Sequence, residues 1–366
     1  MITLGIVGAG QLGRMLAHAG WDLGIRCVFL DPADAPPARG LGPIHRAPFD
    51  DIDALHALAT EVDVLTFEFE NLSAEALARL PSTTPIHPPT RALAIAQSRR
   101  AEKRQFEALG IAVAPWRPVD SQADLEHAAD ALGLPLVVKL DRLGYDGRGQ
   151  EWLREPVDVV GCFNRFNGAA LVAEQRVPFD REVSQIACRS VAGDLALYPL
   201  TENQHRDGIL YRSVVAPMAD ELTQAAAEAT SQLAAELEYV GTLTVEFFVV
   251  GDRLIANEMA PRVHNSGHWT IEGATTSQFE NHLRAVCDLP LGATRALGPV
   301  GMRNFVGSLP RVQDVLALPG VRFHGYDKPP RPGRKLGHAT VLDADYTRLL
   351  ETFKTLDERF PWGGGA

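Results

Sequence analysis

The chain has 366 residues, of which 46% are hydrophobic and 22% charged, and its formal net charge is −11. This length predicts more than one domain, and the composition is typical of a soluble globular protein. The acidic balance argues against a role in nucleic-acid binding, so a local basic site must meet any phosphate that binds.

Residues 1–90 alternate short apolar segments with helical patterns. Residues 2–8, 25–31 and 62–69 are apolar enough to form buried strands, and apolar residues recur with helical period over residues 11–23. Strands separated by helices at short intervals predict a parallel sheet with helical crossovers. The end of this domain is expected after residue 90, because the preceding stretch is rich in proline and threonine.

A glycine motif follows the first predicted strand. Gly8 to Gly13 read GAGQLG, which matches GxGxxG, and Asp31 ends the next predicted strand. In an NAD-linked oxidoreductase such glycines admit a pyrophosphate, and such an aspartate binds a ribose hydroxyl. The same turn is needed wherever a strand leads tightly into a helix, and nothing downstream resembles a hydride-transfer site. The dinucleotide interpretation therefore stays an alternative.

Residues 91–178 read as two helices followed by a small mixed unit. Its most distinctive segment is LGYDGRGQ, residues 143–150, which has three glycines. Free backbone N–H groups in such a segment suit a flap over phosphates. The segment lacks the GK[ST] ending of a P-loop. A single helix is expected over residues 157–166, between two apolar strands.

Charged residues interrupt the apolar strands of this unit. Lys139 precedes the glycine-rich segment, and it is interpreted as a phosphate ligand, with an ion pair in a buried sheet as the alternative. Glu174 ends the next apolar strand and Glu182 begins the one after it. These two residues could hold adenine and ribose, and a solvated loop carboxylate is the alternative for each.

Beyond these residues the strands are expected to be antiparallel, and residues 243–250 and 253–259 form a predicted hairpin. Glu246 and Glu258 lie on its two strands. A strict two-residue turn would pair Glu246 with Asn257 and send Glu258 to the other face. We predict a bulge or a longer loop that brings the carboxylates together, because two acids on an apolar hairpin need a cation or donors. Such a pair suits Mg²⁺ on nucleotide phosphates, and a buried salt bridge is the alternative.

Two polar segments complete the predicted site. Residues 257–270 read NEMAPRVHNSGHWT, in which Arg262 and the polar residues beyond it could bind an anionic substrate beside the metal. Residues 326–338 read YDKPPRPGRKLGH and are locally basic in an acidic protein. This second segment could receive a substrate phosphate, and a solvated surface is the alternative.

Several segments together resemble the ATP-grasp superfamily and, within it, the 5-(carboxyamino)imidazole ribonucleotide synthases, ATP- and bicarbonate-dependent enzymes of purine biosynthesis. They are GAGQLGRML, GYDGRGQ, YPLTENQHRDGIL, NEMAPRVHNSGHWT with SQFENHLRA, and PGRKLGH. The resemblance implies an α/β fold (α+β overall). It also implies a Rossmann-like parallel sheet in residues 1–90, a small central lid in residues 91–178 and an antiparallel-sheet domain in residues 179–366, with ATP between the last two.

The resemblance also implies roles for individual residues. The expected ATP contacts are Arg99, Lys139, Gly144, Tyr145, Asp146, Gly147, Arg148, Gly149, Gln150, Glu174, Gln175, Arg176, Val177, Glu182, His205, Asn257 and Glu258. Glu246 and Glu258 would hold Mg²⁺. Lys139, Arg262, His264 and Asn265 are the expected catalytic residues, with Arg262 facing bicarbonate. The expected substrate contacts are Gln11, Leu12, Glu70, Tyr145, Asp146, Asn265, Lys328, Arg334 and Lys335.

Several alternatives remain beside this interpretation. Formate-dependent glycinamide ribonucleotide transformylase and biotin carboxylase are the closest rivals within the superfamily, and HNSGHWT with PGRKLGH favours the imidazole enzyme. A nucleotide-binding regulator without catalysis is opposed by the complete set of metal, phosphate and anion residues. Many ATP-grasp enzymes have Asn where this chain has Ala260, so the full metal ligand set stays open.

The remaining expectations concern the cell and the partners. Four scattered cysteines with no CxxC pair favour reduced thiols in the cytosol. The N-terminus has no signal-peptide pattern, and no apolar run approaches membrane length, so a soluble cytoplasmic protein is expected. The expected partners are small molecules, without nucleic acid or membrane. The family resemblance suggests a homodimer through the N-terminal domain.

Overall fold

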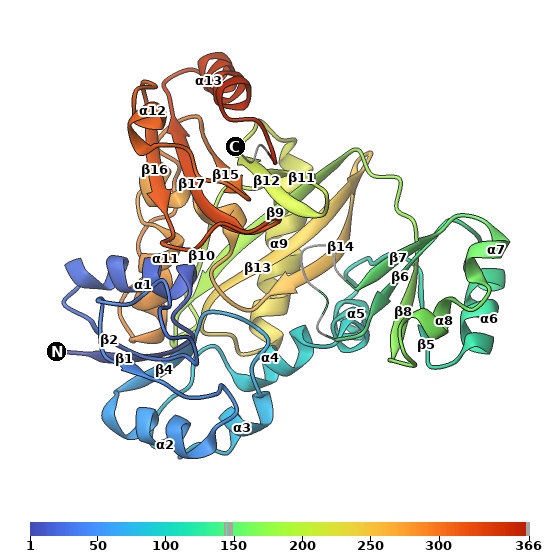
Figure 1. Cartoon of the computed structure of the whole chain (residues 1–366), viewed down its shortest axis with the longest axis horizontal. Coiled ribbons are helices and arrows are strands. Elements are labelled where there is room, and N and C mark those ends of the chain that lie inside the picture. The colour runs from blue at the N-terminus through green and yellow to red at the C-terminus, as the bar shows by residue number, and fades with distance from the viewer. Residues whose placement is uncertain (143, 145–148, 364–366) are drawn as a thin grey trace.

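The computed structural model of the chain describes residues 1–142, 144 and 149–363. Within these residues the strands form three sheets, one each for an N-terminal part, a projecting lid and a large central part (Figure 1). The first sheet is parallel and the other two are antiparallel. The predicted α/β class is therefore confirmed. No helix among the described residues is long and apolar enough to cross a membrane.

The N-terminal sheet has the strand order β3-β2-β1-β4, and all its pairs are parallel. Its strands are β1 (Thr3–Val7), β2 (Arg26–Leu30), β3 (Ile44–His45) and β4 (Val64–Phe67). Its helices are α1 (Gln11–Asp22), α2 (Ile52–Glu61) and α3 (Ala74–Ala78). The Asp51 carboxylate caps α2 by accepting the Ala54 N–H at 3.0 Å, which explains why that helix begins there.

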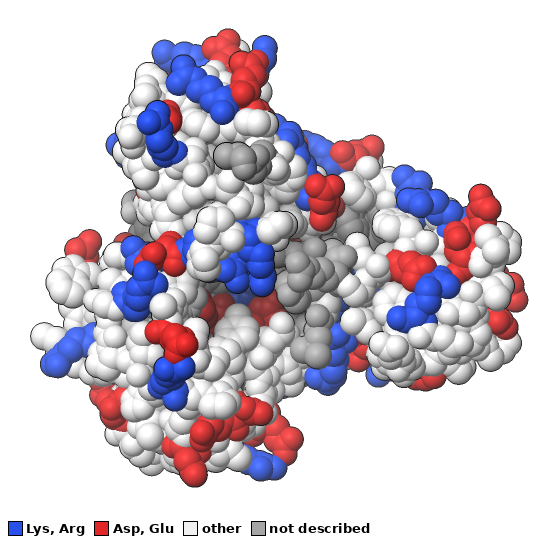
Figure 2. Space-filling view, viewed as in Figure 1, with Lys and Arg blue, Asp and Glu red and all other residues white. Residues whose placement is uncertain are grey.

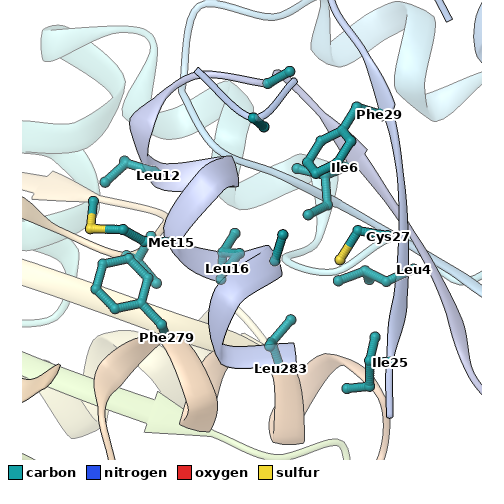
Figure 3. Close-up of a cluster of buried hydrophobic side chains, with 14 of the residues drawn as sticks. Leu4, Ile6, Leu12, Met15, Leu16, Ile25, Cys27, Phe29, Phe279 and Leu283 are labelled. Carbon is teal, nitrogen blue, oxygen red and sulfur yellow. The ribbon is translucent and has the colours of Figure 1, made fainter. Parts of the chain in front are cut away.

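Helix α1 joins this sheet to the rest of the molecule. Figure 3 shows Leu16 of α1 between strand residues on one side and Leu283 on the other. Leu283 and Phe279 lie on α11 (Gln278–Val286), and both belong with α1 to one buried apolar cluster. The apolar stripe of α1 is therefore buried against two elements, which fixes the glycine-rich loop before α1 relative to the central sheet.

Helices α4 (Thr90–Ala96) and α5 (Arg99–Ala108) lead to the lid, which projects from the body in Figure 1. Its sheet has the order β5-β8-β6-β7. The strands are β5 (Trp116–Val119), β6 (Leu136–Leu140), β7 (Gln150–Leu153) and β8 (Leu171–Gln175), and the helices are α6 (Gln122–Leu132), α7 (Pro156–Val159) and α8 (Cys162–Arg165). The single helix expected over residues 157–166 is wrong, because Gly161 has a left-handed conformation with φ of +67° that separates α7 from α8.

The central sheet has the order β14-β13-β9-β11-β12-β15-β17-β16, with β10 beside β9. Its strands are β9 (Arg181–Arg189), β10 (Leu195–Leu197), β11 (Thr201–Arg206), β12 (Ile209–Val214), β13 (Gly241–Val250), β14 (Arg253–Ala260), β15 (Val300–Val306), β16 (Val321–Gly325) and β17 (Lys335–Leu342). The other elements are α9 (Asp220–Glu236), the 3-10 turn η1 (Asn265–Gly267), α10 (Thr270–Gly273), α12 (Val312–Leu316) and α13 (Tyr346–Arg359). Leu222 and Leu233 of α9 pack with Val245 of β13, so α9 is a core element, as its apolar stripe predicts.

Candidate active site

A cavity of about 810 Å³ lies where the three parts meet. Figure 2 shows this region as a hollow, with Lys and Arg side chains at one rim and acidic atoms deeper inside. The predicted site residues that line it are Gln11, Leu12, Glu70, Arg99, Lys139, Gly144, Gln150, Glu174, Gln175, Arg176, Val177, Glu182, His205, Glu246, Asn257, Glu258, Arg262, His264, Asn265, Lys328, Arg334 and Lys335. Gly149 is not part of the lining, and Tyr145, Asp146, Gly147 and Arg148 lie outside the described residues. The roles of all these residues stay predictions.

The β13–β14 hairpin carries the two acidic residues at the floor of the cavity. Glu246 pairs directly with Glu258, and the register shifts between Glu246 and Phe247. Asn257 is the extra residue at this bulge, since Phe247 pairs with Ala256. The predicted bulge is confirmed, and it brings the two carboxylates to the same position of the sheet.

The close pairing of the two carboxylates affects the ionisation of Glu246. Burial and the nearby charge of Glu258 raise the pKa of Glu246 to about 7. Arg99 Nη1 lies 3.3 Å from Glu258 Oε2 and offsets part of this repulsion. Two neighbouring carboxylates with few donors around them suit a divalent cation. Among the described residues, no group of three His, Cys, Asp or Glu side chains is placed to hold a metal ion.

A second charged cluster connects the lid to α5. Lys139 Nζ donates to Glu174 Oε2 at 3.0 Å, and Lys103 Nζ lies 3.2 Å from the same oxygen. Although burial opposes ionisation, the charges of Lys139 and Lys103 lower the pKa of Glu174 to about 2. The solvated-carboxylate alternative for Glu174 is wrong, because this residue is only 3% exposed. Lys139 both forms an ion pair and lines the cavity.

Glu182, at the start of β9, is half-buried and contacts His205 of β11. His205 Nδ1 lies within hydrogen-bond distance of the Glu182 carboxylate. Burial disfavours the charged imidazole, but the bond to Glu182 and the charges of Glu246 and Glu182 together outweigh it and raise the pKa of His205. Glu182 pairs with Asn203 in the ladder of β9 with β11, His205 lies two residues further along β11, and both Glu182 and His205 line the cavity.

Arg262 and Glu70 bind each other across the junction between the central and N-terminal parts. The guanidinium makes a bidentate pair, with Nε and Nη2 donating to the two Glu70 oxygens. Its Nη1 donates to the carbonyl oxygen of Val263 at 3.1 Å. Three of the five N–H donors of Arg262 are thus in use, which leaves two for an anion. Both residues were predicted to lie in the site, but their pairing was not foreseen.

Segment 264–267 brings two polar side chains to the cavity wall. The side chain of Asn265 exchanges hydrogen bonds with that of Asn304, at 3.2 and 2.6 Å. His264 Nε2 lies 3.6 Å from Glu246 Oε1. Burial, with Arg262 next in effect, lowers the pKa of His264 well below its ordinary value. His264 is therefore neutral and adjacent to the carboxylate pair.

The glycine-rich loop before α1 is occupied by a side chain of the protein itself. The Glu68 carboxylate accepts the backbone N–H groups of Gly10 and Gly13, the latter at 2.6 Å. Asp31 accepts the N–H of Ala9 at 2.8 Å. The positions that would bind a pyrophosphate and a ribose are thus filled. This arrangement contradicts the dinucleotide alternative, since the loop has no open anion site.

The basic segment between β16 and β17 closes the cavity on the N-terminal side. Lys328 Nζ donates to Gln11 Oε1, which joins this segment to the start of α1. Burial lowers the pKa of Lys328 to about 8, although the nearby Glu68 charge opposes the shift. Arg334 donates to the Pro329 carbonyl at 3.2 Å, which shapes the loop. Cationic groups therefore gather at this rim.

The sequence analysis did not assign several charged residues to the site, among them four near the acidic floor and the basic rim. Glu68, Glu102 and Arg331 line the cavity, and Lys103 is buried beside it. Glu102 accepts the Met259 N–H at 2.6 Å, and burial, followed by the charge of Glu258, raises its pKa to about 8. Of these residues, the sequence indicated only Arg331, because it lies in the basic segment of residues 326–338. The other three are acids and a lysine in charged or alternating stretches, where burial cannot be read from the sequence.

Comparison with known proteins defines the class. Residues 104–279 match the ATP-grasp domain, residues 1–97 the ribonucleotide synthetase preATP-grasp domain, and residues 301–352 the phosphoribosylaminoimidazole carboxylase C-terminal domain. The chain thus has the domains of an ATP-grasp enzyme. The N5-carboxyaminoimidazole ribonucleotide synthase of Pseudomonas aeruginosa is 49% identical over 95% of this chain and 96% of its own length. The chain belongs to the N5-carboxyaminoimidazole ribonucleotide synthase family.

Solved structures agree with this assignment. The N5-carboxyaminoimidazole ribonucleotide synthetase of Thermus thermophilus superposes with a TM-score of 0.93 at 44% identity, covering 98% of this chain and 99% of that one. The N5-carboxyaminoimidazole synthase of Aspergillus clavatus, solved with ADP and 5-aminoimidazole ribonucleotide, gives a TM-score of 0.90 at 29% identity, with 98% of each chain covered. The similarity therefore extends over essentially the whole chain.

Proposed function

We propose that this ligase uses ATP to carboxylate 5-aminoimidazole ribonucleotide with bicarbonate, giving N5-carboxyaminoimidazole ribonucleotide, ADP and phosphate in purine biosynthesis. The observation that carries the proposal is one cavity that holds the facing Glu246 and Glu258, with Lys139 toward the lid and Arg262 toward the N-terminal part. A phosphate-transfer site and an anion site thus adjoin. The family assignment supports this same reaction.

The nucleotide would bind between the lid and the central sheet. The Lys139 ammonium, oriented by Glu174, is placed to contact the phosphates. Glu246 and Glu258 would hold Mg²⁺, which neutralises phosphate charge when bound. The Glu182–His205 pair lines the same cavity and would bind the ribose or base. This chain then contributes positioning and electrostatic stabilisation, which supply most of the catalysis in phosphoryl transfer.

The first step joins bicarbonate to the γ-phosphoryl group of ATP. A bicarbonate oxygen attacks phosphorus, the bond to the β-phosphate oxygen breaks, and carboxyphosphate and ADP form. The two N–H groups of Arg262 that remain are suited to hold bicarbonate, because Glu70 and Val263 fix the guanidinium plane. Carboxyphosphate hydrolyses in water, so the glycine-rich segment at residues 143–150 is proposed as the cover.

The second step transfers the carboxyl group to the exocyclic amine. The amine nitrogen attacks the carboxyl carbon, directly or after release of CO₂, and phosphate leaves. Gln11, Leu12 and Glu70 are proposed on the ribose side of the imidazole substrate. Its 5′-phosphate would meet the cationic rim formed by Lys328, Arg334 and Lys335. Asn265, held by Asn304, is proposed beside the imidazole.

Two arginine variants test the proposal that bicarbonate and the imidazole substrate bind at different parts of the cavity. Arg262→Ala should abolish most carboxylation while ATP affinity stays within a few-fold, because Arg262 pairs with Glu70 of the N-terminal part and Lys139 pairs with Glu174 of the lid. Arg334→Ala, on the other rim, should instead raise the KM for the imidazole substrate. Near-normal turnover by Arg262→Ala would remove this residue from the mechanism. A loss of ATP affinity in the same variant would place it at the nucleotide.

Three further assignments accompany this function. We propose residues 1–90, 91–178 and 179–366 as the three domains that close on the substrates. Association as a homodimer through the N-terminal domain and a cytoplasmic location are proposed with them. Size-exclusion chromatography with light scattering tests the dimer, and a monomer of 39.7 kDa at assay concentration would contradict it.

A further inference from the structure

We infer that a directed chain of buried hydrogen bonds, set by the Asn203 amide, holds His264 in the tautomer with its proton on Nε2. His264 then acts in the site as a hydrogen-bond donor and not as a base. The tautomer depends only on the protein and on no bound ligand. Only the consequence for catalysis rests on the proposed function.

The chain of contacts is continuous from β12 to the cavity. The Ser213 hydroxyl donates to Asn203 Oδ1 at 2.8 Å, and Asn203 Nδ2 donates to Ser184 Oγ at 3.0 Å. The Ser184 hydroxyl donates to Ser266 Oγ at 2.7 Å. Ser266 Oγ lies 2.8 Å from His264 Nδ1, and the Ser266 backbone N–H reaches the same nitrogen at 3.3 Å.

The sheet builds this chain into the fold. Asn203 of β11 pairs directly with Ser213 of β12, so their side chains share one face of the sheet. Ser184 lies on the neighbouring strand β9, and Ser266 lies in η1, above that face. Ser184, Ser213 and Ser266 are 0% exposed and Asn203 is 5% exposed. The three serines therefore have no contact with bulk water, whereas Asn203 borders the cavity, and each serine depends on its neighbour for a partner.

The amide of Asn203 decides the direction. A hydroxyl can donate either way, but a carboxamide has one donor end and one acceptor end. With Nδ2 toward Ser184, the Ser184 hydroxyl must donate onward to Ser266 and the Ser266 hydroxyl onward to His264. Nδ1 of His264 thus meets a hydroxyl and a backbone N–H, both of which are donors. It must be the unprotonated nitrogen, and the ring proton is on Nε2.

This tautomer restricts what His264 can do. Its Nε2–H faces the cavity, where Glu246 Oε1 lies at 3.6 Å. A nitrogen that already carries a proton cannot take one from the attacking amine, and the other nitrogen is occupied by Ser266. His264 is therefore placed to donate to a reactant oxygen. The amine proton passes to an oxygen of the departing phosphate or to solvent. Asn203 and Ser266 are positioning residues in this arrangement.

The direct test is the tautomer itself. The full-length protein is labelled with ¹⁵N at histidine only, and two-bond ¹H–¹⁵N correlations are recorded without nucleotide or substrate. The His264 signals are assigned by their loss in His264→Gln. We expect an unprotonated Nδ1 and a protonated Nε2. An Nδ1–H tautomer or a doubly protonated ring in the unaltered protein would overturn the inference. Neither result depends on the ligase activity.

Variants then test the role of the amide. In Asn203→Asp both side-chain oxygens accept hydrogen bonds, so the Ser184 hydroxyl donates to the new carboxylate and no longer to Ser266. Ser266 Oγ is then free to accept a hydrogen bond donated by His264 Nδ1. Protonated Nδ1 should then be detectable, with kcat about tenfold lower and the KM for ATP little changed. Ser213→Ala removes a donor without reversing the chain and should leave the tautomer unchanged. An unaltered tautomer in Asn203→Asp, or an altered one in Ser213→Ala, would refute Asn203 as the directing residue. If Asn203→Asp does not fold, Ser184→Ala takes its place, because it interrupts the chain of hydrogen bonds and should give a mixture of the two His264 tautomers. An unaltered His264 tautomer in Ser184→Ala would also refute the inference.

Discussion

The pair formed by Glu70 and Arg262 offers the sharpest prediction, because both members reach the cavity and each fixes the other. The Arg262 side chain is 17% exposed and that of Glu70 is 30% exposed. Although burial opposes ionisation of Glu70, the Arg262 charge lowers the pKa of that carboxyl, so the ion pair persists at neutral pH. Glu70→Ala leaves the guanidinium without its two-point anchor.

The size of the effect follows from the burial. Removing one partner of a fully buried pair costs about 3–5 kcal/mol, and the partial exposure of Glu70 reduces the expected loss of unfolding free energy to about 2 kcal/mol. Loss of a charge-assisted anchor should lower kcat/KM for bicarbonate by about tenfold to a hundredfold. ATP affinity should change by less than about threefold, since Glu70 is not placed at the phosphates.

The assay combines urea unfolding with steady-state kinetics in which bicarbonate is varied. Glu70→Gln is the matched variant, because it retains one acceptor oxygen and should lose less. The exposed pair of Arg79 and Glu75, at 60% and 77% exposure, is the surface control. Glu75→Ala should cost less than about 0.5 kcal/mol. Unchanged bicarbonate kinetics in Glu70→Ala would refute the reasoning that the pair orients the anion site.

Three other predictions concern the metal, the nucleotide and the glycine loop. Because the folded pKa of Glu246 is raised from 4.5 to about 7, the stability that its protonated form contributes should be lost as pH rises through 7. Thermal unfolding with and without Mg²⁺ should then show the ion stabilising the protein most above pH 7, and Glu246→Gln should lose both effects. Lys139→Met should weaken ATP binding by at least about tenfold in calorimetry, whereas Lys103→Met, which is outside the cavity, should lower the thermal midpoint instead. NADH fluorescence should not respond to the protein, because Glu68 occupies the glycine loop, and saturable binding would contradict that geometry.

The elements that the sequence predicted best are those whose pattern is local. The parallel N-terminal sheet and the β13–β14 hairpin depend on spacing within a short stretch, which packing then respects. The bulge at Asn257 was predicted on energetic grounds, since Glu246 and Glu258 on an apolar hairpin would otherwise be separated. An energetic argument of this kind succeeds when burying a residue, such as a carboxylate without a partner, has a large free-energy cost in the predicted environment.

The parts that escaped prediction depend on contacts between distant segments. Lys103 lies in a helix rich in charged residues, and its burial beside Glu174 of β8 arises from tertiary packing. Glu68 reads as one more residue of an alternating strand, yet β4 ends at Phe67 and the carboxylate turns into the glycine loop. The pairing of Arg262 with Glu70 joins residues 192 positions apart, so no local pattern signals it.

The most direct test of the central claim is ADP release from purified protein with Mg-ATP and bicarbonate, with and without 5-aminoimidazole ribonucleotide. Carboxylated product is trapped in the same reaction. We predict ADP release that depends on the imidazole substrate and is matched by product in equal amount. ATP binding without stimulation by that substrate, or stimulation by glycinamide ribonucleotide and formate in its place, would contradict the assignment.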